Sequence, residues 1–251
     1  MGQLLTVLIC ATSLNTAQTI RLPYDLSVEP VSDYTKSGNS SLAKPLLAYF
    51  AIPYAEPPVG TLRFQPPVAP KRGNGQLLKN LDFGKICLQD GLTEHQSEDC
   101  LTLSVFRPKS DDDDKKLPVL IWTHGGAFNS GSGGENGILA SMVGNAPHDF
   151  IGVTFNYRLG ALGFLPSQLT HEVGLLNLGL KDKRMAYEWV QKYIVLFGGD
   201  PDKVTVRRLN LYGETSLTSY RFGGNLREHT LVALIFSTRS QIPIASLHSI
   251  R

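Results

Sequence analysis

The sequence predicts an α/β fold with a mixed, mostly parallel sheet. Residues 150–156 form a continuous apolar run, which is typical of a strand buried on both faces. Residues 180–195 have the periodicity of an amphipathic helix, and residues 204–206 begin another strand. A strand, a helix and a strand in this order pack as parallel strands joined by a crossover, which defines the α/β class.

The composition suits one large domain or a piece of a larger one. The chain has 251 residues, of which 42% are hydrophobic, enough to bury a sizeable core. Glycine (24) and proline (15) are frequent, which favours turns between strands over a helical bundle. In the predicted helix, Met185, Trp189 and Tyr193 recur every four residues, and we interpret this stripe as core packing.

Charge and motif content exclude several classes of partner. The net charge of +2 gives no reason to expect nucleic acid or an acidic membrane surface, and no apolar run is long enough for a transmembrane segment. No metal-ligand cluster or dinucleotide motif occurs, and the Gly-rich residues 131–137 lack the ending of a phosphate-binding loop. We therefore expect no metal and no cofactor; the oligomeric state stays open.

Residues 1–17 are predicted to be a signal peptide. Residues 4–11 form a short apolar core, and residues 11–13 are small enough for a cleavage site. The positively charged start of such a peptide is missing, so a buried strand is the alternative. The prediction implies a secreted, extracellular protein.

Cleavage of that peptide would remove Cys10 and leave two cysteines, Cys87 and Cys100. In an oxidising compartment this pair is interpreted as a disulfide, which would contribute about 3 kcal/mol by loop closure. Two buried thiols are the alternative. Asn39 begins an Asn-Ser-Ser glycosylation sequon, in agreement with secretion.

The other elements expected within residues 18–206 are mostly strands. Residues 20–60 alternate apolar runs with turn residues, as antiparallel strands at a sheet edge do, and the prolines of residues 53–70 predict an irregular, non-helical segment. Residues 104–107 and 117–122 are predicted strands. Between them, residues 111–116 form a charge run that is interpreted as a solvated turn, with a protease recognition sequence as the alternative.

A glycine-rich loop follows the strand predicted at residues 117–122. Residues 124–128 read His-Gly-Gly-Ala-Phe, and glycine tolerates the dihedrals that turn successive backbone N–H groups toward one point. Two converging donors suit the tetrahedral oxyanion of ester hydrolysis, where each contributes about 3 kcal/mol. We therefore predict an oxyanion hole at Gly125, Gly126 and Ala127; a plain glycine-rich turn is the alternative.

Several blocks of sequence occur in an order that indicates a family. Residues 98–108 read Glu-Asp-Cys-Leu-Thr-Leu-Ser-Val-Phe-Arg-Pro, and residues 50–67 begin Phe-Ala-Ile-Pro-Tyr-Ala-Glu-Pro-Pro-Val-Gly. Shorter blocks follow at residues 156–160 (Asn-Tyr-Arg-Leu-Gly), 163–164, 174–177 and 189–201. Over residues 20–206 the chain resembles the type-B carboxylesterase family, which includes cholinesterases, fungal lipases and neuroligins.

This resemblance implies an α/β-hydrolase fold, of which the chain would be a truncated N-terminal half. It implies a bridge between Cys87 and Cys100 and oxyanion donors at Gly126 and Ala127. It also implies hydrolysis of a carboxylic ester, either a small molecule or a lipid, through a serine acyl-enzyme. A non-catalytic binding protein of neuroligin type is the alternative function.

The chain departs from the family at the expected nucleophile. Family members continue after the strand with Gly-Glu-Ser-Ala-Gly, whereas residues 212–217 read Tyr-Gly-Glu-Thr-Ser-Leu, and no Gly-x-Ser-x-Gly occurs in the sequence. Thr215 then occupies the nucleophile position, and Ser216 is an alternative one residue out of register. A β-branched residue is poorly suited to the strained elbow, and Leu217 adds a side chain where close packing needs none.

A serine triad also needs a histidine base and an acid that orients it. By resemblance both would lie C-terminal of the elbow, beyond this chain, so the chain as written is expected to be inactive. His124 is interpreted as structural. The other histidines lie in predicted loops or in the tail, where no motif supports a catalytic base: His95, His148, His171, His229 and His248.

Residues 207–251 form an atypical tail. Residues 1–206 contain 12 Lys and 6 Arg, whereas residues 207–251 contain no Lys and 6 Arg. The tail also lacks helical periodicity. We interpret it as a disordered segment or as the product of a shifted reading frame.

Overall fold

The structure is a mixed sheet with helices on both faces. The computed structural model describes residues 19–37, 40–71, 75–91, 93–109, 116–134, 137–208 and 220–222. Within these ranges the largest sheet has seven strands in the order β12-β11-β9-β10-β8-β4-β3. Their bounds are β3 Val31–Ser37, β4 Ser40–Pro53, β8 Thr102–Pro108, β9 Leu117–Thr123, β10 Ile151–Phe155, β11 Gly199–Arg208 and β12 Tyr220–Phe222.

The central strands of this sheet are parallel, and its flanks are antiparallel. β9 pairs in parallel with β10 on one side and with β11 on the other. β8, β4 and β3 continue from β10 as antiparallel strands, and β12 pairs antiparallel with β11. The predicted mixed sheet is confirmed, but among the described residues two of its six pairings, β9–β10 and β9–β11, are parallel, so this part of the sheet is mostly antiparallel. The four antiparallel pairings come from the N-terminal strands and from β12, which lie outside the predicted strand–helix–strand region. All five residues of β10 are buried, as expected from its apolar run.

Short strands form two smaller sheets. β1 (Ile20–Leu22) pairs antiparallel with β2 (Leu26–Val28), and β5 (Gln76–Leu78) joins β2 in parallel. β6 (Ile86–Cys87) pairs with β7 (Gln96–Ser97). The antiparallel strands predicted within residues 20–60 are thus present as β1–β2 and as the β3–β4 edge.

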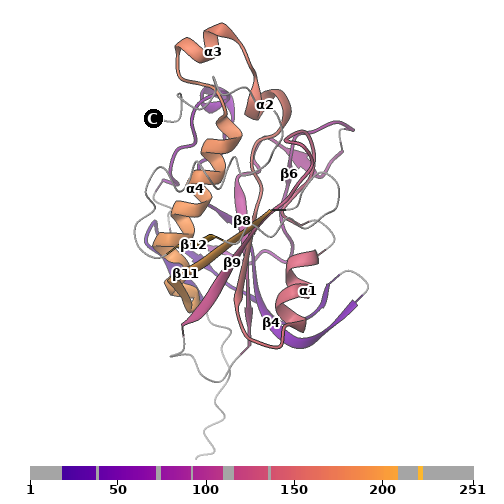
Figure 1. Ribbon diagram of the computed structural model, residues 1–251. Helices are drawn as coiled ribbons and strands as arrows, with labels where there is room; N and C mark the ends of the chain where they lie inside the picture. Colours follow the sequence, from indigo (N-terminus) through magenta and orange to yellow (C-terminus); the bar gives the residue numbers. More distant parts are fainter. Residues whose placement is uncertain are drawn as a thin grey trace, which may run out of the picture.

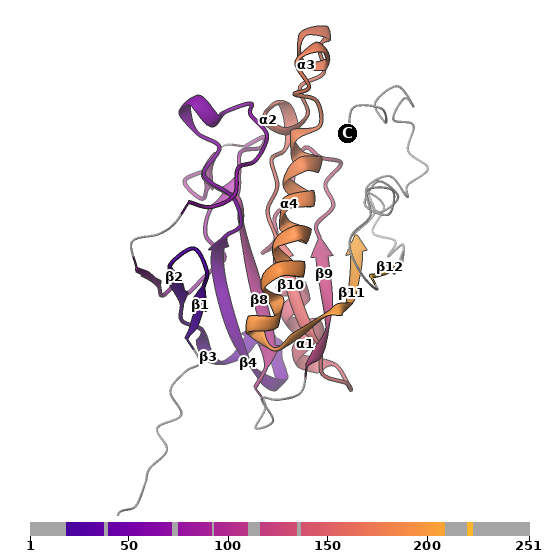
Figure 2. The ribbon, with the colours of Figure 1, turned by 90° about the vertical axis from the view of Figure 1, so that its left-hand side faces the viewer.

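Helix α4 (Leu178–Tyr193) covers one face of the large sheet (Figure 2). Trp189 is buried in the larger core cluster, and Met185 and Tyr193 pack against that cluster, so the predicted stripe is confirmed as core. The helix passes into a 3-10 turn, η3 (Ile194–Phe197), which ends at Gly198 with a positive φ of 79°.

Helix α1 (Ile138–Asn145) covers the opposite face (Figure 1). It packs in a second cluster with aromatic side chains of the sheet, among them Phe50, Phe106 and Trp122. Two short helices, α2 (Gly160–Phe164) and α3 (Gln168–Glu172), lie beyond the end of the sheet toward which β9 and β11 point (Figure 2). Among the described residues, no helix is long and apolar enough to cross a membrane.

Two short segments differ from the sequence-based prediction. Residues 53–70 contain one 3-10 turn, η1 (Gly60–Leu62), which forms because residues 60–63 between the prolines keep their N–H donors. His171 lies in α3 and not in a loop, because Ser167 forms a capping box with Thr170 at the start of that helix.

Strand pairing in the large sheet continues past residue 206. β11 continues to Arg208 because its parallel partner β9 extends to Thr123, and these two residues are in register. β12 adds three paired residues of the tail to the edge of the sheet. Residues 209–219 and 223–251 lie outside the described residues.

Candidate active site

The candidate site is the loop of residues 124–131, which directly follows β9. β9 is paired on both sides by parallel strands, and most of its side chains are buried. The position and direction of its carboxyl end are therefore fixed. Open α/β sheets place ligands at the carboxyl ends of such strands. Phe128 packs on Phe164 of α2, with ring centroids 4.7 Å apart, so α2 borders the loop.

Three successive residues of the loop have positive φ angles. The values are 90° at Gly126, 53° at Ala127 and 67° at Phe128. A Cβ atom at Gly126 would overlap the carbonyl group of Ser130, so only glycine fits that position. The N–H groups of Asn129 and Ser130 both donate to the carbonyl oxygen of Gly126, at 2.9 and 3.0 Å, and close the turn.

The loop presents consecutive backbone donors. The N–H groups of Gly125, Gly126 and Ala127 have no hydrogen-bond partner among the residues that the structure describes. In the next residue, the carbonyl oxygen of Phe128 accepts a hydrogen bond of 2.7 Å from the N–H of Gly160. That bond fixes the loop to the start of α2.

His124 is buried at the base of the loop and is neutral. Its ring stacks on Tyr157, with centroids 4.4 Å apart and planes 17° apart, and its Nδ1 lies 3.1 Å from the carbonyl oxygen of Gly125. Burial, assisted by the positive charge of Lys183, lowers the pKa of His124 to about 3, while the hydrogen bond with Gly125 opposes that shift. The structural role predicted for His124 agrees with these contacts.

Lys183 places a buried cation beside the loop. Its Nζ lies 3.9 Å from the centroid of the Tyr157 ring and 4.8 Å from that of Phe128. A desolvated cation over an aromatic ring contributes about 2 kcal/mol. Lys183 therefore connects α4 with the stack formed by His124 and Tyr157 and with the end of the oxyanion sequence.

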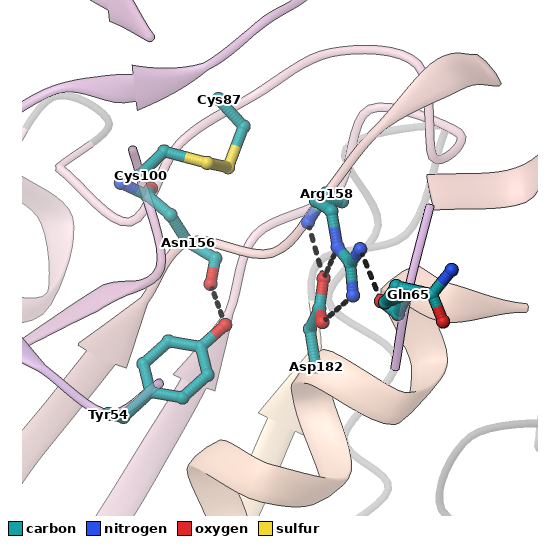
Figure 3. A network of polar contacts seen from close by, with 7 residues as sticks. All are labelled: Tyr54, Gln65, Cys87, Cys100, Asn156, Arg158 and Asp182. Atoms are coloured by element: carbon teal, nitrogen blue, oxygen red, sulfur yellow. Dashed lines mark hydrogen bonds and ion pairs between the residues drawn. A yellow bond between two sulfur atoms is a disulfide. The ribbon is translucent and has the colours of Figure 1, made fainter. Parts of the chain in front are cut away.

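A buried ion pair holds the segment after β10 against α4 (Figure 3). Arg158 donates to both carboxylate oxygens of Asp182, at 2.8 and 2.7 Å, and its backbone N–H donates to the same carboxylate at 3.0 Å. The guanidinium also donates to the carbonyl oxygen of Gln65 at 2.8 Å. Burial raises the pKa of Asp182, and Arg158 opposes that effect.

The predicted disulfide is present between Cys87 and Cys100, with Cα atoms 5.1 Å apart. Both residues are buried, and Figure 3 shows the bridge between them. The hydroxyl of Tyr54 donates to the carbonyl oxygen of Asn156 at 2.6 Å. The side chain of Asn156 accepts from the N–H of Gly133 at 2.8 Å, which fixes the segment after the loop.

The structure does not bring the other predicted site residues to the loop. His95, His148 and His171 are exposed. Several candidates lie outside the described residues: the signal peptide at 1–17, Asn39, Thr215, Ser216, His229 and His248. Among the residues that are described, no cluster of His, Cys, Asp or Glu could hold a metal ion.

Sequence reasoning missed Lys183 and Asp182 as site residues. They lie in the run Lys-Asp-Lys-Arg at residues 181–184, which charge alone would assign to solvent, yet both are buried. The available signal was Arg158, in the block at residues 156–160, because a buried guanidinium requires a carboxylate partner.

Known proteins are similar to this chain over the part that contains the central strands and the candidate loop. A sequence model of the carboxylesterase family matches residues 35–207. Secreted lipase 4 of Gibberella zeae is 44% identical over 179 residues, which cover 67% of this chain and 32% of the lipase. The para-nitrobenzyl esterase of Bacillus subtilis is 45% identical over 163 residues, which cover 62% of this chain and 32% of the esterase.

Solved structures are also similar to this chain. A PNB esterase has a TM-score of 0.60 at 38% identity and covers 76% of this chain and 38% of its own. Aspergillus niger EstA has a TM-score of 0.63 at 32% identity, with coverage of 78% and 36%. The chain spans about a third of the length of the curated relatives that it matches. Because the family model matches residues 35–207, more than half of the sequence, the chain belongs to the carboxylesterase family, and the solved structures show that it has the α/β-hydrolase fold.

Proposed function

We propose that this chain carries the oxyanion-binding part of a secreted carboxylic ester hydrolase. The observation that carries the proposal is the succession of unpartnered N–H groups at Gly125, Gly126 and Ala127, counted over the described residues. Relatives named as a secreted lipase and a para-nitrobenzyl esterase support esters as the substrate class. The secreted relative and the buried disulfide also support an extracellular location.

The proposed chemistry follows from the charge that ester hydrolysis creates. Attack of a serine hydroxyl on the ester carbonyl converts its oxygen into an oxyanion, while a general base takes the hydroxyl proton. The N–H groups of Gly126 and Ala127 donate to that oxygen. Each such donor contributes about 3 kcal/mol to the stability of the transition state when it is fixed in advance. The hydrogen bonds within residues 126–130 and from Gly160 supply that rigidity.

We also propose that the 251-residue chain does not hydrolyse esters by itself. Its sequence has Thr215 where the family resemblance implies the nucleophilic serine, Leu217 at the following small position, and no Gly-x-Ser-x-Gly. An oxyanion hole stabilises a charge that a nucleophile must first create. Oxyanion donors that lack a competent nucleophile therefore bind an ester or an anion but do not lead to hydrolysis.

Binding of a carboxylate tests the oxyanion part independently of turnover. Butyrate, whose carboxylate resembles the oxyanion, is titrated into ¹⁵N-labelled protein, and neutral butanol serves as the control. The amide resonances of Gly126 and Ala127 should shift with butyrate and not with butanol. Equal responses to both compounds, or no response at these residues, would contradict the proposed donors.

Hydrolysis of para-nitrophenyl butyrate tests the inactivity. We expect the rate with the folded chain to equal the rate without protein, with folding checked by a cooperative thermal transition. Hydrolysis that disappears in Thr215→Ala would identify Thr215 as a nucleophile and overturn this part of the proposal. Loss in Ser216→Ala alone would move the nucleophile by one residue and would also overturn it.

A further inference from the structure

The amide of Gln89 makes a pair of hydrogen bonds to the far end of the candidate loop. Its Oε1 accepts from the N–H of Gly131 at 2.9 Å, and its Nε2 donates to the carbonyl oxygen of Gly131 at 3.1 Å. The side chain thus satisfies both backbone groups of one residue, as a neighbouring strand would. Gln89 is 42 residues away from Gly131 in the sequence, so this contact joins two separate segments.

Gly131 contacts the base of the oxyanion sequence. It has a φ of 108°, and a Cβ atom there would lie 2.5 Å from Nδ1 of His124 and 3.1 Å from the carbonyl oxygen of Gly125. These are the two atoms that form the hydrogen bond between His124 and Gly125. A displacement of Gly131 therefore acts directly on the residues that begin the row of donors.

Gln89 is itself fixed by the disulfide loop, residues 87–100. Its Nε2 also donates to the carbonyl oxygen of Cys87 at 3.1 Å. Its backbone N–H donates to Oε1 of Gln96 at 3.0 Å, and Nε2 of Gln96 donates to the carbonyl oxygen of Gly91 at 3.1 Å. Both amide hydrogens of Gln89 are thus used, one toward the disulfide and one toward the candidate loop.

We infer that Gln89 is a positioning residue for the oxyanion donors and that the Cys87–Cys100 disulfide acts on these donors through it. The inference rests on the proposed function for the role of the loop. Donors that stabilise a developing charge must be held in position before the reaction. The positive φ angles of Ala127 and Phe128 are unfavourable for non-glycine residues, so the loop needs contacts that hold it. Gln89 supplies such a contact from outside the loop.

Amide hydrogen exchange, resolved by NMR in the full chain, tests this inference without any ester. The reporters are the hydrogen-bonded N–H groups of Ser130, Gly131 and Gly160. Gln89→Met keeps the length of the side chain and removes its three hydrogen bonds, two to Gly131 and one to Cys87. We expect exchange about tenfold faster at Gly131 and at least about threefold faster at Ser130 and Gly160. The N–H of Val153 in β10 should keep its rate.

Gln168→Met is the matched control. Gln168 is an exposed residue whose amide, among the described residues, donates only to Glu172 of the same helix, so its loss should leave all reporters unchanged. Unchanged reporters in Gln89→Met, or equal acceleration in both variants, would overturn the inference. Acceleration of Val153 to the same extent as the reporters would also overturn it, because the effect would then be general stability.

A variant with a titratable side chain distinguishes the effect of the hydrogen bonds from the effect of side-chain packing. In Gln89→Glu the ionised carboxylate can still accept from the N–H of Gly131, but it faces the carbonyl oxygens of Gly131 and Cys87 without a donor. These oxygens repel the carboxylate and displace it, whereas the protonated acid restores a donor. Protection of Gly131 should therefore be low at pH 7 and recover at pH 4, near the ordinary pKa of glutamate. Wild-type protein provides the baseline at each pH. Equal protection at both pH values would contradict a hydrogen-bonding role.

Replacement of the disulfide tests the second half of the inference. Cys87→Ala/Cys100→Ala should accelerate the same reporters, and adding Gln89→Met should then change their rates less than twofold. If the fold-changes in exchange rate caused by the two changes multiply in the combined variant, the disulfide and Gln89 act separately, which would contradict the inference. Failure of these exchange experiments would leave the butyrate titration unaffected, so the two proposals can fail independently.

Discussion

Lowering the pH from 7 to 5 should destabilise the fold through His124. In the folded state burial holds the pKa of His124 at about 3, whereas the ordinary value of 6.5 applies to the unfolded chain. Between these two values the unfolded state binds one proton more than the folded state. Stability is therefore fully present above pH 6.5 and decreases as the pH falls toward 3.

The magnitude follows from the distance between pH 5 and the unfolded pKa. Each pH unit in this window costs about 1.4 kcal/mol, so 1.5 units give about 2 kcal/mol. Urea unfolding at pH 7 and pH 5 measures the loss. Carboxylates also titrate in acid, so the same measurement is made on His124→Phe, which keeps a ring against Tyr157 but cannot titrate. Subtracting the pH dependence of this variant from that of the wild type removes the contribution of the carboxylates. An equal pH dependence in both proteins would refute the buried neutral histidine.

Three further changes should lower the free energy of unfolding measured in urea. Arg158→Met leaves the carboxylate of Asp182 buried without its partner and should lower the free energy of unfolding by about 3–5 kcal/mol. The double variant Arg158→Met/Asp182→Leu should restore most of this loss. Unchanged stability in the single variant would contradict the ion pair. Replacing Cys87 and Cys100 by alanine should cost about 3 kcal/mol, and a loss below the error of the measurement would contradict a stabilising bridge. Gly126→Ala adds a methyl group that overlaps a neighbouring carbonyl and should cost about 1–3 kcal/mol, whereas a neutral result would contradict the described turn.

Local patterns were sufficient for much of the fold. The apolar run that became β10 and the four-residue spacing of α4 depend on neighbouring residues, and both elements lie within a few residues of the predicted bounds. The loop after β9 could also be located, because glycine and the preceding strand are local signals. The disulfide followed from the number of cysteines and from the family resemblance.

Contacts between distant segments could not be read from such patterns. Gln89 and Gly131 lie in two irregular segments without periodicity, so their pairing depends on how the sheet brings the loops together. Arg158 and Asp182 are 24 residues apart, and burial of Lys183 depends on the packing of α4 on rings that arrive from other elements. The sequence predicted only the start of a strand at residues 204–206, and its continuation as β11 to Arg208 depends on the register with β9.

Covalent labelling tests whether the chain, which presents backbone oxyanion donors, lacks a competent nucleophile. A fluorophosphonate phosphonylates an activated serine or threonine hydroxyl, and mass spectrometry of the intact 251-residue chain counts the adducts. An active serine esterase serves as the positive control. We predict that the folded chain stays unlabelled while the control is labelled completely. A stoichiometric adduct on Thr215 or Ser216 would contradict the account.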